Sequence, residues 1–213
     1  MLTSDWIMVI SPHPDDLEIG MGGTVAKLKA SGKKIISLVV TDGRRCSRKP
    51  DYTEDDMAKI RAAEVETSSA LLGIDLLVQL RLHDITTSEN CLVATEQMRS
   101  LITNYSPQQV YCPHPTLDRH PTHRLCAKLL LDSVDTRNRP EIWAYEVWGL
   151  FHSWDRLEDI SESIEIKLKA IRCHKSQLEH KAYDVGISGL NAWRGVFTDF
   201  DRSTRFAEAF KRL

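Results

Sequence analysis

Short apolar runs alternate with longer amphipathic segments through the first two thirds of the chain. The apolar runs predict strands at Trp6 to Ile10, Lys34 to Thr41, Leu76 to Leu82 and Gln109 to Cys112. The segments between them have helical spacing, at Gly22 to Ala30, Glu54 to Leu72, Thr95 to Tyr105 and Pro121 to Val134. Regular alternation of strand and helix is typical of α/β proteins. We therefore predict a mostly parallel sheet with helices on both faces.

The last third of the chain continues the sheet. Strands are predicted at Glu141 to Val147, near Trp154 to Ile160 and at Phe206 to Phe210, with one helix from Glu162 to Leu178. No internal repeat or linker divides the chain, so we expect a single domain over residues 1–213. The aromatic residues around Trp148 are expected to pack in the core or between subunits, and a sugar-stacking wall is the alternative.

Charge and composition exclude several classes of protein. The 28 Lys and Arg residues nearly balance the 30 Asp and Glu residues, so no overall attraction to nucleic acid is expected. No apolar run approaches the roughly 18 residues of a membrane-spanning helix. The five cysteines are scattered without a CxxC pair and predict free thiols in a reducing compartment. With no export signal in Met1 to Asp5, we expect a cytoplasmic protein, and self-association into a homo-oligomer is left open.

Ionisable side chains concentrate in two loops that follow predicted strands. The first runs from Ser11 to Glu18, and the second, from Pro113 to His123, holds three histidines and an aspartate. Because ligands collect beyond the carboxyl ends of parallel strands, the two loops can meet around one ion. Two histidines and one carboxylate suit a catalytic zinc that keeps a position open for water, and they suit ferrous iron as well.

Spacing suggests roles within these loops. His13 and Asp16, three positions apart, can converge on a metal, while Asp15 would face the attacking water as a general base. Pro121 at the first helical position puts His123 in the first turn of the helix and His120 directly before that turn. One of these two histidines can bind the metal while the other faces the substrate. The competing interpretation is that such loop residues are solvated or cap a helix.

A nucleotide-binding loop is a second hypothesis for the same region. Gly20, Gly22 and Gly23 open a helix, and Asp42 ends the second strand about 20 residues later, much as in a dinucleotide-binding fingerprint. Val25 replaces the third small residue, however, and the glycines stand after eight loop residues dense in charge instead of directly after the strand. Close packing of the helix on the sheet explains these glycines better.

The motifs together resemble a known family. The stretch from Pro12 to Thr24 resembles the HPDD(E)xxxGGT signature of the LmbE-like, or PIG-L, family of zinc-dependent N-deacetylases. Further similarities are Thr41-Asp42-Gly43, the helix with Arg61 and Glu64, the loop from Asp118 to His123, and His174-Ser176-Gln177. The resemblance covers nearly the whole chain, and it implies a Rossmann-like α/β fold, one zinc ion and hydrolysis of an acetamide, commonly on a glucosamine unit.

The resemblance also implies individual roles. His13, Asp16 and His123 match the zinc ligands of the family, Asp15 matches its general base, and His120 matches the histidine that assists the oxyanion or the leaving amine. The expected protein is therefore an N-deacetylase of an N-acetylglucosamine-type sugar or its conjugate. The alternatives are a nucleotide-binding domain without hydrolytic activity and a metal-binding relative that has lost catalysis.

The resemblance is less specific about the residues that contact the substrate. Arg61 and Asp84 match positions near those that contact sugar hydroxyls in the family, while Arg44 and the segment around His83 depart from the usual pattern. The loop after the second strand carries four cations, Arg44, Arg45, Arg48 and Lys49. A solvated surface loop is the preferred interpretation of these cations. The functional alternative is that Arg44 and its neighbours attract an anionic aglycone. The other histidines, His83, His114, His152, His174 and His180, are expected to be structural or superficial.

Overall fold

The computed structural model describes residues 4–46, 50–134, 139–198 and 204–213, and its strands form one sheet in the order β3-β2-β1-β4-β5-β7-β6. The strands are β1 (Trp6–Ser11), β2 (Lys34–Thr41), β3 (Leu76–Leu82), β4 (Gln109–Pro113), β5 (Glu141–Tyr145), β6 (Arg156–Asp159) and β7 (Ala207–Arg212). β1 pairs in parallel with β2 and β4, β2 with β3, and β4 with β5. Among the described strands, β7 alone runs in the opposite direction, and it pairs antiparallel with β5 and β6. The predicted mostly parallel α/β sheet is confirmed.

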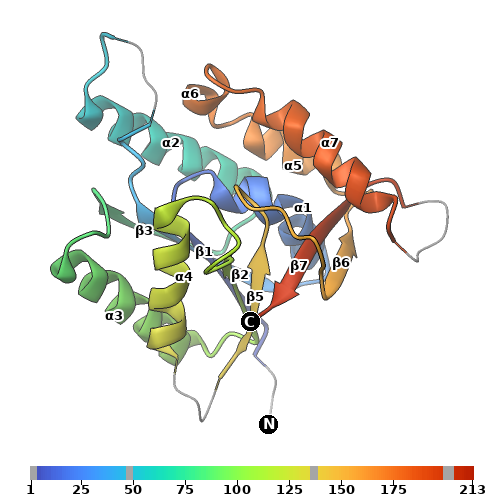
Figure 1. Ribbon diagram of the computed structural model, residues 1–213, viewed down its shortest axis with the longest axis horizontal. Helices are drawn as coiled ribbons and strands as arrows, with labels where there is room; N and C mark the ends of the chain where they lie inside the picture. The colour runs from blue at the N-terminus through green and yellow to red at the C-terminus, as the bar shows by residue number, and fades with distance from the viewer. Residues whose placement is uncertain (1–3, 47–49, 135–138, 199–203) are drawn as a thin grey trace.

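Helices cover both faces of this sheet (Figure 1). They are α1 (Asp16–Ala30), α2 (Glu54–Leu72), α3 (Ser88–Tyr105), α4 (Pro121–Ser133), α5 (Ile164–Ile171), α6 (Lys175–Leu178) and α7 (Tyr183–Gly195). α3 and α4 pack on one face, whereas α1, α2, α5, α6 and α7 gather on the other. Among the described residues, no helix has both the length and the apolar character needed to cross a bilayer.

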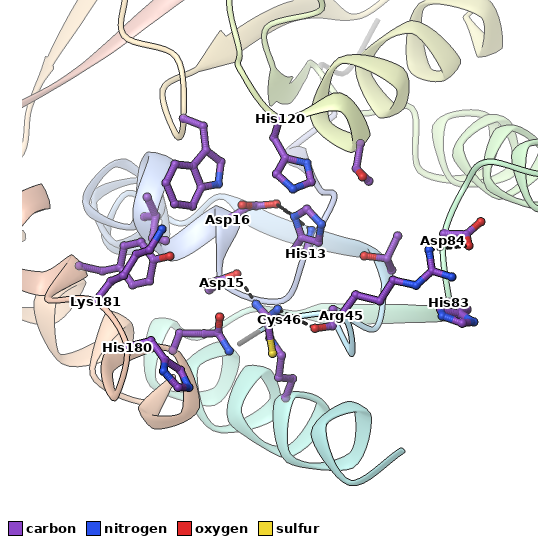
Figure 2. Close-up of a pocket in the computed structure, with 18 of the residues that line it drawn as sticks. His13, Asp15, Asp16, Arg45, Cys46, His83, Asp84, His120, His180 and Lys181 are labelled. Atoms are coloured by element: carbon purple, nitrogen blue, oxygen red, sulfur yellow. Dashed lines mark hydrogen bonds and ion pairs between the residues drawn. The ribbon is translucent and has the colours of Figure 1, made fainter. Parts of the chain in front are cut away.

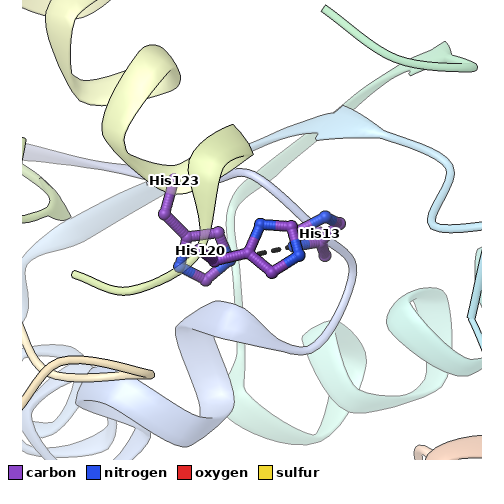
Figure 3. A group of neighbouring side chains, drawn as sticks. All are labelled: His13, His120 and His123. Atoms are coloured by element: carbon purple, nitrogen blue, oxygen red, sulfur yellow. Dashed lines mark hydrogen bonds between the residues drawn. The ribbon is translucent and has the colours of Figure 1, made fainter.

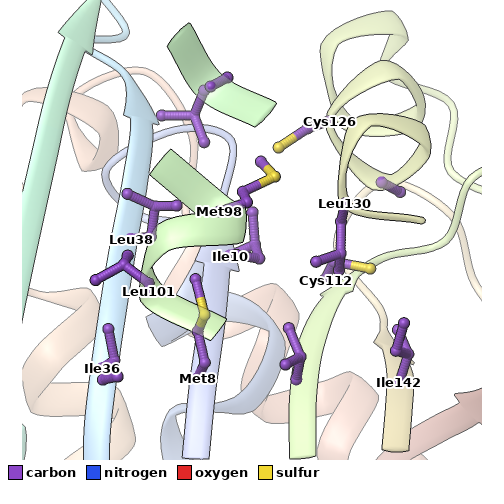
Figure 4. Packing of buried hydrophobic residues seen from close by; sticks show 14 of the residues in the cluster. Met8, Ile10, Ile36, Leu38, Met98, Leu101, Cys112, Cys126, Leu130 and Ile142 are labelled. Carbon is purple, nitrogen blue, oxygen red and sulfur yellow. The ribbon is translucent and has the colours of Figure 1, made fainter. Parts of the chain in front are cut away.

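Alternating side chains of the central strands fill two separate cores. Met8, Ile36 and Leu38 point toward α3 and α4 and pack on Met98 and other buried residues there (Figure 4). The intervening residues of the same strands, such as Ile7, Val9 and Ile35, pack against α1 on the opposite face. Because successive side chains of a strand point to opposite faces, the unbroken apolar runs of β1 and β2 serve both cores.

α1 begins earlier than the sequence predicts. Helical residues start at Asp16 and not at Gly22, and a kink at Met21 (φ −150°, ψ 22°) divides the helix. The glycines allow close packing, because a Cβ on Gly20 would lie 2.2 Å from Tyr145 Cδ2 and one on Gly23 would lie 2.8 Å from Ile160. The packing interpretation of these glycines is therefore confirmed.

A buried carboxylate accepts hydrogen bonds from two backbone N–H groups that follow this kink. Glu208 on β7 accepts hydrogen bonds from the backbone N–H groups of Gly23 (3.0 Å) and Thr24 (2.8 Å). Its charge is balanced by Lys167 of α5, whose Nζ lies 2.5 Å from Oε1, and both side chains are fully buried. The contact joins α1, α5 and β7 behind the loop that carries His13.

The helical region after β6 differs from the prediction. The single helix expected from Glu162 to Leu178 is two helices, α5 and α6, separated by a turn at residues 172–174. Helix α7 was not predicted. Gly186 and Gly189 lie within it, and glycine has a low helix propensity.

Candidate metal centre and active site

The two ionisable loops meet at the carboxyl edge of the sheet. β1 and β4 are adjacent and parallel, so the chain leaves both strands on the same side. His13 follows β1, and Asp16 starts α1 three residues later. After β4, Pro121 opens α4, which makes His120 the N-cap and puts His123 in the first turn. The predicted convergence of the loops therefore occurs in the structure.

Three polar atoms from these loops face one another at the distances of a metal site. His13 Nδ1 lies 2.9 Å from His123 Nε2 and 3.4 Å from Asp16 Oδ2, and His123 Nε2 lies 3.3 Å from that same oxygen. Ligands about 2.0–2.1 Å from a tetrahedral zinc ion are separated from each other by about 3.3 Å. The three atoms thus fit one small cation, with no rearrangement of the loops.

His120 completes a group of three imidazoles (Figure 3). The potential ligand atoms of His13, His120 and His123 all lie within 4.8 Å of one another. The centre of the His120 ring lies 4.7 Å from that of His13 and 4.8 Å from that of His123. Within the described part of the chain, His120 Nδ1 is buried without a hydrogen-bond partner. This ring nitrogen therefore makes no hydrogen bond that would give it a structural role.

Asp118 orients both histidines of the second loop. Its Oδ2 lies 3.2 Å from His123 Nδ1, which leaves His123 Nε2 to face Asp16. Its Oδ1 accepts a hydrogen bond of 2.7 Å from the backbone N–H of His120. A carboxylate on the far ring nitrogen is the usual support of a metal-binding histidine, because it selects the tautomer and holds the ring.

The electrostatics of the cluster favour a cation. Burial alone would raise the pKa of Asp16, but His123 and His13 outweigh it and hold this pKa far below its usual value. Burial would also lower the pKa of His123, yet Asp16 and Asp118 raise it to about 10. For His120, burial and the charges of His13 and His123 act together and lower the pKa to about 4. The carboxylates thus stabilise positive charge between His13 and His123.

Asp15 has different surroundings from its neighbour Asp16. Its Oδ1 accepts a hydrogen bond of 2.5 Å from Arg61 Nη2, and Arg61 Nη1 donates to the carbonyl oxygen of Gly43 at 3.1 Å. No described residue donates to Asp15 Oδ2. Arg61 is only 3% exposed, so it holds the Asp15 carboxylate in place from behind.

A cavity of about 340 Å³ opens above these residues (Figure 2). One wall comes from the loops after β2 and β3 and includes Arg45, Cys46, His83 and Asp84. The opposite wall comes from the loop after β5 and from the α6–α7 region, and its residues include Trp148, Gln177, His180, Lys181 and Tyr183. His13, Asp15, Asp16, Arg61 and His120 also line the cavity.

The predicted substrate residues occupy different places. Asp84 lines the cavity and lies 3.3 Å from Arg45 Nη1. Arg44 points to Asp42 and Asp55, at 2.7 Å from each, and is not among the lining residues. Arg45 is thus the cation of this loop that reaches the cavity, while Arg48 and Lys49 lie outside the described residues.

Sequence reasoning missed Lys181 and Tyr183, which lie at the start of α7, a helix that was not predicted. For Trp148, packing in the core or between subunits was preferred and a sugar-stacking wall was the alternative; Trp148 lines the cavity. Of the remaining histidines, His114 accepts backbone hydrogen bonds that close its own loop, and His174 is 1% exposed. Neither of these two lines the cavity, and their structural role stays a prediction. His83 and His180, in contrast, line the cavity.

Comparisons with known proteins identify the family. The PIG-L family, described as GlcNAc-PI de-N-acetylase, matches residues 8–134, which is more than half of the chain. A diacetylchitobiose deacetylase from Thermococcus kodakarensis is 29% identical over 198 residues, covering 84% of this chain and 72% of the relative. A probable N-acetyl-α-D-glucosaminyl L-malate deacetylase 2 from Bacillus cereus is 26% identical over 184 residues, covering 81% of this chain and 84% of the relative.

A solved structure gives the same result. The N,N'-diacetylchitobiose deacetylase of Pyrococcus horikoshii superposes with a TM-score of 0.82 at 27% identity, covering 99% of this chain and 84% of that one. The chain belongs to the PIG-L family of de-N-acetylases.

Proposed function

We propose that this protein is a metal-dependent N-deacetylase that hydrolyses the acetamide of an N-acetylglucosamine-type sugar or its conjugate. The observation that carries the proposal is the meeting of His13 Nδ1, Asp16 Oδ2 and His123 Nε2 within 3.4 Å of one another, with the Asp15 carboxylate beside them. Relatives named as deacetylases of acetylated amino sugars support the substrate class.

We assign the metal to His13, Asp16 and His123. Zinc fits this set of two imidazoles and one carboxylate, and ferrous iron is the alternative. The bound ion supplies an activated water and polarises the amide carbonyl. Asp118 supports the assignment, because it orients His123 from the far side of the ring.

The remaining roles belong to side chains of the cavity. Asp15 accepts a proton from the attacking water while the water oxygen bonds to the amide carbon. Arg61 holds the Asp15 carboxylate in place. His120, whose pKa is lowered to about 4, is neutral at pH 7 and donates its ring N–H to the developing oxyanion. The proton that Asp15 has accepted then passes to the leaving nitrogen, directly or through His120. The C–N bond then breaks, and acetate and the free amine leave. We propose Asp84 and Arg61 as the residues nearest the sugar hydroxyls.

The nucleotide-binding alternative has less support. The backbone N–H groups of Gly23 and Thr24, which a phosphate would need, already donate to Glu208. Gly20 and Gly23 are covered by Tyr145 and Ile160. No observation favours a relative that has lost catalysis, because the ligand atoms, the base and its partner arginine are all present.

We also propose a cytoplasmic location. All five cysteines are free, and two of them, Cys112 and Cys126, are buried in the core. Free thiols are typical of proteins from reducing compartments.

The test of the proposal is an assay for amine release from N-acetylglucosamine glycosides, coupled to metal analysis of the same preparation. The wild-type protein should carry about one divalent ion per chain and release equal amounts of acetate and primary amine. His13→Ala should lose most of the ion and the activity together, since two remaining ligands hold zinc weakly. Full metal occupancy in His13→Ala would refute the ligand assignment, and a metal-loaded wild type without amine release would refute the activity.

A further inference from the structure

Among the described residues, the aspartates, arginines and lysine that line the cavity are paired with an opposite charge, with one exception. Asp15 is bound by Arg61, Asp84 by Arg45, and Asp16 faces His13 and His123. Lys181 lines the same cavity and is exposed, and no carboxylate of the described residues lies within ion-pair distance of it. Among the described residues that line the cavity, Lys181 is therefore the cation without a counter-charge.

Aromatic contacts hold this cation at the wall. Lys181 Nζ lies 4.6 Å from the centre of the Trp148 ring, a cation–π contact. The Trp148 ring in turn meets Tyr183 edge to face, with ring centres 6.0 Å apart and an interplanar angle of 81°. A cation–π contact uses the charge of the ammonium but leaves its N–H groups free to donate.

The loop under Trp148 is tied to the metal centre. The backbone N–H of Trp148 donates to Asp118 Oδ2 at 3.2 Å, the same oxygen that faces His123. Gly149 packs so closely on the backbone of Leu117 that a Cβ there would lie 2.2 Å from its carbonyl oxygen. The position of Trp148, and with it that of Lys181, is thus set relative to the proposed metal ligands.

We propose that Lys181 binds an anionic group, a carboxylate or a phosphate, on the part of the substrate that lies beyond the acetylated sugar. This inference rests on the proposed function and adds the charge of the substrate to it. An ammonium group is a point charge that can bind either anion. Because the Trp148 ring already holds the Lys181 side chain, that side chain loses less conformational freedom when an anion binds. A neutral aglycone would leave Lys181 without a partner in the complex.

Three derivatives of N-acetylglucosamine test the inference: the methyl glycoside, the carboxymethyl glycoside and the 1-phosphate. The wild-type enzyme should have a higher kcat/KM for at least one anionic compound than for the methyl glycoside. Lys181→Gln should lower that ratio about fivefold, the effect of about 1 kcal/mol at a partly exposed charge, and Lys181→Arg should retain most of it. Lys175→Gln is the matched control, because Lys175 lies on the neighbouring α6 outside the cavity lining, and it should leave the ratio unchanged.

The outcomes separate the inference from the activity on which it rests. An equal response of all three compounds to Lys181→Gln, or no preference in the wild type, would overturn the inference while deacetylation itself still stands. Failure to release amine from any compound would instead refute the proposed function. Calorimetric binding of the deacetylated methyl and carboxymethyl glycosides, which are not turned over, then still decides whether Lys181 selects the anion. A preference for one anion identifies it as carboxylate or phosphate.

Discussion

Asp15 and Asp16 are adjacent and have the same side chain, but they face different partners, which supports the different tasks proposed for them. Asp16 faces two imidazoles that lower its pKa, whereas Asp15 turns to the Arg61 guanidinium. The first turn of α1 separates the two side chains, because consecutive residues of a helix point about 100° apart. A negatively charged metal ligand and a general base can therefore be neighbours in the chain.

Substitution of each aspartate should separate the two roles. Asp15→Asn keeps the shape of the side chain and all three proposed ligands, so it should retain the metal and lose activity by at least about 10²-fold, as is typical for a general base. Asp16→Asn should lose metal as well as activity. Metal content by elemental analysis and kcat/KM on one glycoside measure both effects, and equal metal loss in the two variants would show that their roles are exchanged.

Arg61 offers a similar distinction between positioning and substrate binding. Its guanidinium is buried and spans Asp15 and Gly43, so Arg61→Lys should displace the carboxylate and lower kcat by about tenfold with a smaller change in KM. Steady-state kinetics with Arg99→Lys, an exposed control on α3, measures the effect. A rise in KM at constant kcat would instead support the sugar contact that the family resemblance implies.

At the scale of elements, prediction succeeded where the ends of an element are marked locally. β2, α2 and β3 have the predicted bounds, since Thr53 caps α2 through a capping box and Gly73 ends it with φ 69°. The two loops of the proposed metal centre were predicted because they are short and contain many ionisable side chains. The wall with Lys181 was not, because Gly186 and Gly189 argue against a helix there and only tertiary packing brings the start of α7 to the cavity.

The kinked helix α1 gives a prediction at the same scale. Gly20→Ala should destabilise the protein by about 1–3 kcal/mol, because its Cβ would collide with the Tyr145 ring, which is fixed by a hydrogen bond of 2.7 Å from its hydroxyl to the Ile10 carbonyl. Gly189→Ala in α7 is the control, because its Cβ would meet no atom within 4 Å and should stabilise the helix by about 0.5–1 kcal/mol. Urea unfolding measures both changes, and a destabilised Gly189→Ala or an unaffected Gly20→Ala would contradict the packing described here.

For the whole molecule, the proposed metal centre joins distant parts of the chain. His13 and His123 are 110 positions apart in sequence, and they follow the central strands β1 and β4 of the sheet. An ion held between them connects the ends of two strands and the starts of α1 and α4. Since the unfolded chain does not preserve this arrangement, binding should stabilise the folded state as a whole.

Metal removal should therefore lower the melting temperature. A free metal concentration 100 times the dissociation constant contributes about 2.7 kcal/mol, which for a chain of this size corresponds to roughly 5–10 °C. The measurement is the difference in melting temperature between chelator-treated and zinc-reconstituted protein, by calorimetry. The difference should vanish in His123→Ala, whose lost ring removes a ligand, and persist in His83→Ala, whose ring lines the cavity outside the histidine cluster. A shift that survives in His123→Ala would mean that the stabilising ion binds elsewhere, because a site at the ends of β1 and β4 cannot close without that residue.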